Sequence, residues 1–219
     1  MRGIDVSMNF KERIINPNKN QILSQEGYFI WCGSAVKGND EKYHMFASRW
    51  RKDCDFKGWL TTSSIIRCES LTPEGPYEFV EELVSLKSQE WCSKTVHNPT
   101  VKKIGDKFYL FYVGTTYRDD APNIMEESFN HPARYNQKIG VAVADNPEGP
   151  WRPSENNPIL SPRPEGFWDS SYVTNPSVFV ENDNEIRLIY KSRICDPDTT
   201  KGRLILGMAT ANNPEGPYE

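Results

Sequence analysis

Short apolar runs separated by turn residues recur along the chain at the spacing expected of β-strands. Residues 101–104 are apolar at both ends, residues 105–106 supply turn chemistry, and residues 108–113 continue as an aromatic and β-branched run. Residues 139–144 form a third run, and a turn at residues 146–150 leads to a weaker fourth. Prolines at the turns exclude a continuing helix. The pattern predicts strand, turn, strand, loop, strand, turn, strand.

This pattern is repeated along the chain. The segment WCSKTVHNPT, which begins at Trp91, returns as WDSSYVTNPS at Trp168. The register aligns the Asn-Pro pairs at Asn98 and Asn175, and a more degenerate copy upstream places Gly33 at the position of Asn98. The turn sequence PEGPY or PEGPW occurs in each copy, and the period is about seventy residues. Such internal similarity indicates a repeat architecture.

Four antiparallel strands per repeat are the sequence signature of a β-propeller, whose blades pack face to face around a central channel. The predicted fold class is all-β, with three four-stranded blades at about residues 28–88, 89–161 and 162–219. An all-β sandwich, which also has short strands and frequent turns, is the alternative. Propellers usually close with four to eight blades. We therefore expect these three to belong to a larger ring, completed by further sequence or by a partner, and to self-associate if a blade face is left exposed.

Composition limits the classes of function. The chain of 219 residues has a net charge of -4, and its basic residues are scattered, so no nucleic-acid partner is predicted. Nothing in the sequence resembles a membrane span or an apolar leader. The expected location is cytoplasmic for the chain as given, and periplasmic or secreted if a signal peptide precedes it.

The five cysteines show no CxxC spacing, which argues against a zinc site or a disulfide framework. No metal and no cofactor are predicted. Two loops could border a pocket: residues 51–63 mix charges of both signs with two aromatic residues, and residues 117–137 form a long insertion that contains His131. Residues 194–202 are the shorter counterpart of that insertion. The alternative for residues 51–63 is an ordinary solvated loop.

The innermost strand of each propeller blade lines the channel, so the residues that lead into the Asn-Pro pairs converge from successive blades. They combine aromatic rings with polar groups, as sugar-binding sites do. Besides the predicted catalytic residues, we expect substrate contacts from Trp31, Ser34, Arg49, Trp91, Asn98, Trp168 and Asn175. Packing between blades is the alternative role for the three tryptophans.

Four segments resemble the five-bladed β-propeller glycoside hydrolases, the family 43-like group that includes arabinanases, xylosidases and anhydro-galactosidases. They are GYFIWCGSAVKGNDEKYHMFASRW, VHNPTVKKIGDKFYLFYVGTT, KIGVAVADNPEGPW and TNPSVFV. The resemblance covers nearly the whole chain. It implies a five-bladed ring, of which this chain supplies three blades. It also implies hydrolysis of a plant or algal oligosaccharide by an acid and a base, with inversion at the anomeric carbon.

The chain departs from that family at the starts of the inner strands, which carry Gly33, Asn98 and Asn175 instead of carboxylates. The best remaining acid-base pair is His97 with Asp169, since the resemblance includes a branch that uses a histidine as the general acid. Asp169 could instead cap a turn, and His97 could simply hydrogen-bond between blades.

Two other functions fit the same residues. A glycan-binding propeller without catalysis is favoured by the missing carboxylates. A glycoside phosphorylase needs only one acid, because phosphate is the nucleophile, and would require a basic cluster such as Arg49 and Arg51 near the channel. All three functions imply an oligosaccharide partner.

Overall fold

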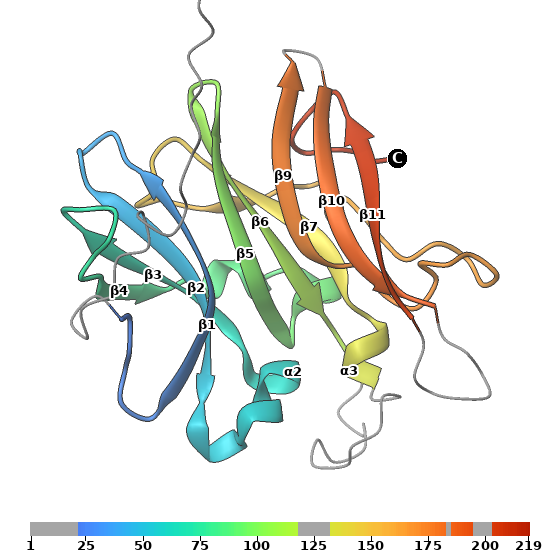
Figure 1. Ribbon diagram of the computed structural model, residues 1–219, viewed down its shortest axis with the longest axis horizontal. Helices are drawn as coiled ribbons and strands as arrows, with labels where there is room; N and C mark the ends of the chain where they lie inside the picture. Colours follow the sequence, from blue (N-terminus) through green and yellow to red (C-terminus); the bar gives the residue numbers. More distant parts are fainter. Residues whose placement is uncertain (1–21, 118–131, 183–184, 195–202) are drawn as a thin grey trace, which may run out of the picture.

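The computed structural model describes residues 22–117, 132–182, 185–194 and 203–219, which form three antiparallel sheets lying side by side (Figure 1). The first sheet contains β1 (Tyr28–Lys37), β2 (Tyr43–Arg51), β3 (Ser64–Ser70) and β4 (Glu78–Glu82). The second contains β5 (Thr95–Ile104), β6 (Lys107–Thr115), β7 (Lys138–Ala144) and β8 (Arg152–Pro153). The third contains β9 (Thr174–Asn182), β10 (Glu185–Arg193) and β11 (Leu204–Ala211). The predicted all-β fold is confirmed.

Each sheet is a meander in which every strand pairs with the next along the chain. In the third sheet Glu219 and Thr210 exchange two backbone hydrogen bonds of 2.7 and 3.0 Å. Arg152 of β8 pairs with Val143 of β7 at the corresponding place in the second sheet. Glu219 therefore occupies the position of a fourth strand.

Short helical segments connect the strands. They are η2 (Lys52–Cys54), η3 (Phe56–Gly58), α2 (Trp59–Thr62), η4 (Val84–Lys87), η5 (Glu90–Cys92) and α3 (Pro132–Tyr135). In Figure 1, α2 and α3 lie at the same end of the sheets. Among the described residues, no helix has the length and apolar character needed to cross a bilayer.

A bulge interrupts the inner strand of each sheet at the same point. Cys32, Asn98 and Asn175 all have a positive φ, between 50° and 55°, and the register of pairing shifts around each of them. The structure therefore aligns Cys32, and not Gly33, with the two asparagines, which corrects the sequence alignment by one residue. β5 begins at Thr95, on the N-terminal side of the bulge and well before the strand predicted at residues 101–104.

The PEGP turns also repeat in three dimensions. Tyr77 Oη, Trp151 Nε1 and Tyr218 Oη each donate a hydrogen bond to the carbonyl oxygen of the proline four residues earlier. The aromatic residue after each turn is thereby held in the same place in every sheet. The function of this repeated sequence is structural.

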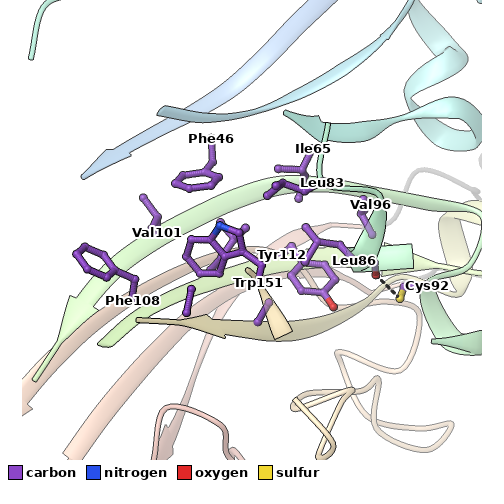
Figure 2. Close-up of a cluster of buried hydrophobic side chains, with 13 residues drawn as sticks. Phe46, Ile65, Leu83, Leu86, Cys92, Val96, Val101, Phe108, Tyr112 and Trp151 are labelled. Atoms are coloured by element: carbon purple, nitrogen blue, oxygen red, sulfur yellow. Dashed lines mark hydrogen bonds between the residues drawn. The ribbon is translucent and has the colours of Figure 1, made fainter. Parts of the chain in front are cut away.

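The core between the first and second sheets is continuous (Figure 2). Phe46 of β2 meets Trp151 edge to face, with ring centroids 5.2 Å apart. Tyr112 is fully buried in the same cluster, and the Cys92 Sγ donates a hydrogen bond of 3.1 Å to the Leu86 carbonyl. Full burial of each large side chain contributes about 2 kcal/mol. A second cluster packs the second sheet against the third.

The far face of the third sheet is apolar and exposed. Leu206 and Met208 of β11 are 71% and 55% exposed. Leu206 and Met208 are the counterparts of Ile139 and Val141 in β7, because both pairs occupy the same register on the middle strand of their sheet. Ile139 and Val141 are fully buried between the second and third sheets. The repeat thus presents a blade-packing face that no described residue covers.

Cys32, Cys54, Cys68 and Cys92 are free thiols. Cys195, His131 and most of residues 117–137 and 194–202 lie outside the described residues, so the expectations for those loops stay predictions.

Candidate functional site

A pocket of about 240 Å³ opens where the inner strands of the three sheets carry their bulges. Its aromatic lining consists of Trp31, Trp50, Phe56, Trp59 and Tyr172. Its polar lining consists of Ser48, His97, Asn98, Arg134, Gln137, Thr174, Asn175 and Lys191. The described lining contains no carboxylate.

The repeat brings the polar residues of the pocket together. Trp31, His97 and Thr174 precede the bulges of β1, β5 and β9, and all three line the pocket. Asn98 and Asn175 follow directly, and asparagine tolerates the left-handed backbone there better than most residues. The Asn98 backbone N–H donates to Ser48 Oγ at 2.8 Å, which ties β5 to β2. The predicted convergence of inner strands is therefore present.

The segment between β2 and β3 supplies one wall of the pocket. Trp59 of α2 meets the His97 ring edge to face, with centroids 5.3 Å apart. Phe56 of η3 makes a similar contact with Trp31 at 5.7 Å, and the Arg134 guanidinium lies over the Trp59 ring at 5.6 Å. Trp31 is 56% exposed, so an aromatic ring remains available to a ligand.

His97 is neutral at pH 7. Burial, together with the Lys191 charge, lowers the pKa of His97 to about 4, and the Asn98 side chain partly opposes this shift. A neutral imidazole can accept a proton or bind a hydroxyl group, but it does not act as a cationic acid near neutrality.

Several buried side-chain atoms of the pocket lining have no hydrogen-bond partner among the described residues. They include Trp50 Nε1 and both ring nitrogens of His97. Trp50 and His97 are 3% and 2% exposed. Buried donors and acceptors are almost always satisfied in proteins, so these atoms are suited to a polar ligand.

Asp169 does not line this pocket. It is 2% exposed, accepts a hydrogen bond of 2.7 Å from Tyr190 Oη, and accepts another of 2.7 Å from Arg163 Nε. Burial, together with this contact to Asp169, raises the pKa of Tyr190. The structure therefore does not bring Asp169 and His97 to a common pocket, and their predicted catalytic pairing stays a prediction.

Trp91 and Trp168 lie outside the pocket lining as well. Trp91 stacks on Tyr112 and Trp168 stacks on Tyr190, each with ring centroids 5.7 Å apart. A Cβ added to Gly140 would meet Trp91 at 2.4 Å, and one added to Gly207 would meet Trp168 at 2.5 Å. Both indoles thus pack on a glycine of their own sheet, whereas the alternative role predicted for them is packing between blades.

The other two predicted substrate contacts have different surroundings. Arg49 is buried and donates hydrogen bonds to Gln25 at 2.8 Å and to Glu82 at 2.5 Å. Ser34 Oγ accepts a hydrogen bond from the Val101 backbone N–H at 3.1 Å. Ser34 lines a second groove, which is formed by residues of the three inner strands. Neither residue lines the pocket itself.

The sequence reasoning missed several lining residues, namely Ser48, Trp50, Arg134, Gln137, Tyr172 and Lys191. Ser48 and Lys191 face Trp31 and Thr174 across the first strand pair of their sheets. This cross-strand register is the signal that could have identified them.

One side-chain cluster could be mistaken for a metal centre. Single ligand atoms of Asp40, His44 and Glu148 lie within 4.8 Å of one another. Arg67 Nη1 lies 3.1 Å from His44 Nδ1, and because arginine only donates, Nδ1 must accept. The proton then resides on Nε2, which faces Asp40 at 3.1 Å. This arrangement satisfies the histidine without a metal.

Comparison with known proteins finds similarity in sequence to one curated protein and in fold to several solved structures. No family model matches the chain. The chain is 29% identical over 131 residues to xylosidase/arabinosidase 43A of Humicola insolens, a match covering 58% of this chain and 31% of that protein. The chain thus spans about a third of the length of this relative.

Solved structures confirm the propeller fold. A family 117 glycoside hydrolase of the marine bacterium Zobellia galactanivorans matches with a TM-score of 0.68 at 18% identity, over 88% of this chain and 55% of that one. A thermostable family 43 glycoside hydrolase matches with a TM-score of 0.55 at 17% identity, over 86% and 53%. An α-L-arabinofuranosidase of Lactobacillus brevis matches with a TM-score of 0.51 at 15% identity, over 85% and 50%. The resemblance to propeller glycoside hydrolases is therefore confirmed, and the chain spans about half the length of these structures.

Proposed function

We propose that this protein is a glycoside hydrolase that binds a plant or algal oligosaccharide in the pocket beside the three bulges. The observation that carries the proposal is the pocket lining, in which the aromatic rings of Trp31 and Trp59 stand beside the amides of Asn98 and Asn175. Aromatic faces suit the C–H faces of a sugar ring, and a few placed polar groups suit its hydroxyls. Similarity to propeller glycosidases supports the same conclusion.

The proton-transfer groups are a separate part of the proposal. Hydrolysis requires an acid and a base on opposite sides of the glycosidic bond, and inversion requires room for water between them. Because the described lining lacks a carboxylate, we propose that at least one of these groups comes from outside it. His97 lines the pocket and can contact the sugar directly, whereas Asp169 lies outside the lining.

A glycan-binding propeller is the second candidate, and the absence of a described carboxylate in the pocket favours it. The phosphorylase alternative finds little support at its expected residues. Arg49 is paired with Glu82, and the exposed Arg51 donates hydrogen bonds to Asp53. A phosphate site would have to use other cations.

The test is product chromatography of plant and algal oligosaccharides incubated with the chain, with and without phosphate. Trp59→Ala and Asn98→Gly should each weaken binding and lower any turnover, whereas Phe79→Ala removes a half-exposed ring outside the pocket and should change neither. Release of sugar in water supports the hydrolase. Binding with no turnover under any condition would instead identify a glycan-binding protein, and release that requires phosphate would identify a phosphorylase.

A further inference from the structure

Lys191 places a positive charge in the pocket at a position where the fold does not require one. It lies on β10 opposite Thr174, where the cross-strand register of the other two sheets places Ser48 and Val113. Neither of those residues is charged. The ammonium group is thus a feature of this pocket and not of the repeat.

The surroundings of Lys191 contain other cations. Burial lowers the pKa of Lys191, and the nearby charges of Arg134 and Arg193 lower it further. No carboxylate of the described residues forms an ion pair with it. Lys87, another half-buried lysine, differs in this respect, since it donates to Ser64 Oγ at 2.7 Å and is stabilised by Glu82. Removing an ammonium from water without an anionic partner is costly.

We propose that this pocket selects an acidic sugar, whose carboxylate or sulfate group binds the Lys191 ammonium while its ring contacts Trp31 and Trp59. This inference rests on the proposed function and names its substrate class. Arg134, which lies over the Trp59 ring, adds positive charge on the same side of the pocket. A neutral sugar would leave the lysine charge uncompensated in a half-buried site, so the acidic form binds more tightly.

An anion at Lys191 would also act on His97. The Lys191 charge is one of the causes that hold the pKa of His97 low. Compensating this charge with a carboxylate raises the affinity of the imidazole for a proton. Substrate binding would thus move His97 toward the cationic form that a general acid requires.

The test compares an oligogalacturonide with its methyl ester by calorimetric titration, since esterification removes the negative charge and adds only a methyl group to each carboxyl. The wild-type chain should prefer the acidic form by at least about tenfold, and Lys191→Met should bring the ratio of the two affinities close to one. Lys191→Arg should restore most of the preference. Lys107→Met makes the same change of net charge at the far end of β6, beside Asp145, and should keep the wild-type ratio. Thermal unfolding checks that each variant is folded.

The outcomes separate this inference from the proposed function. Equal affinity for acid and ester overturns the acidic sugar and leaves the glycosidase intact, whereas failure of every oligosaccharide to bind overturns both. Binding of inorganic phosphate that depends on Lys191, without preference for the acidic sugar, would assign the charge to free phosphate and overturn the inference. A rise in the His97 pKa on binding of the acid, measured by NMR, supports it.

Discussion

Tyr190 donates a hydrogen bond of 2.7 Å to Asp169, and this contact joins the middle strand of the third sheet to the segment that precedes β9. Arg163 completes the surroundings of the carboxylate at 2.7 Å. We therefore expect Asp169→Asn to lower the free energy of unfolding by about 2 kcal/mol, because a charged hydrogen-bond acceptor is lost from a buried site. Tyr190→Phe should cost about half as much. Urea denaturation measures both.

The same variant addresses the predicted catalytic role of Asp169. If its role is structural, the folded fraction of Asp169→Asn should retain its activity per folded molecule. A stable variant that loses activity more than a hundredfold would instead restore Asp169 as a catalytic residue.

Asn98 combines a ligand-facing amide with a left-handed backbone, and two substitutions separate these properties. Asn98→Gly keeps the left-handed backbone conformation favourable but removes the amide. It should weaken oligosaccharide binding by about fivefold to tenfold, through loss of a hydrogen bond. Asn98→Ala should weaken binding equally and also cost about 1 kcal/mol of stability. Unfolding curves that coincide for the two variants would contradict this account of the bulge.

Cys32 occupies the same left-handed position as the two asparagines, with φ of 55°. Cys32→Asn should stabilise the chain by about 0.5–1 kcal/mol, because asparagine tolerates this backbone better. Cys32→Ala keeps the steric conflict of a Cβ and is the matched control, with no gain expected. Chemical denaturation compares the three proteins, and a gain in the alanine variant would assign the effect to loss of the thiol.

Burial of neutral His97 makes stability depend on pH. Its pKa falls from 6.5 to about 4 on folding, so the folded chain resists protonation that the unfolded chain accepts. As the pH falls from 6.5 to about 4, the wild-type chain should lose up to roughly 3 kcal/mol of stability that His97→Gln does not lose. Denaturation at a series of pH values measures the difference, and parallel curves for the two proteins would mean that His97 is solvated.

The exposed face of the third sheet should cause self-association of the 219-residue chain. Leu206 and Met208 offer the surface that their counterparts in β7 bury against a neighbouring sheet. Leu206→Glu with Met208→Glu should shift the chain toward monomer in sedimentation velocity. As a control, Val84→Glu changes a residue that is 71% exposed and belongs to neither β10 nor β11. A wild-type chain that is monomeric at high concentration would contradict this prediction.

The strands, their order and the convergence of inner strands were predictable because they follow from local apolar patterns and an internal repeat. The register of the first copy was not, since the hairpin from Lys37 to Tyr43 is one residue longer than that from Lys103 to Phe108. Because of this extra residue, the strand after the hairpin and the bulge before it cannot both be aligned with the second copy without a gap. Sequence similarity therefore aligned Gly33 with Asn98, although the backbone conformation of Asn98 is found at Cys32.

The pocket was predicted only in part for a related reason. Trp31, His97, Asn98 and Asn175 sit at repeated positions, so the repeat identifies them. Lys191 depends on cross-strand register, and other lining residues come from connections that only tertiary packing brings to the pocket. The sequence pattern that repeats Trp91 and Trp168 also contains the residues that line the pocket. The structure separates the two groups, because Trp91 and Trp168 pack against glycines outside the pocket.

The central claim is that the pocket beside the three bulges binds an oligosaccharide. Its most direct test is a crystal structure determined after soaking crystals of the chain with the oligosaccharide that it binds most tightly. The account predicts electron density for a sugar ring against Trp31 and Trp59, with hydroxyl groups within hydrogen-bond distance of His97 and Asn98. Sugar bound elsewhere on the surface, with the pocket holding only solvent, would contradict it.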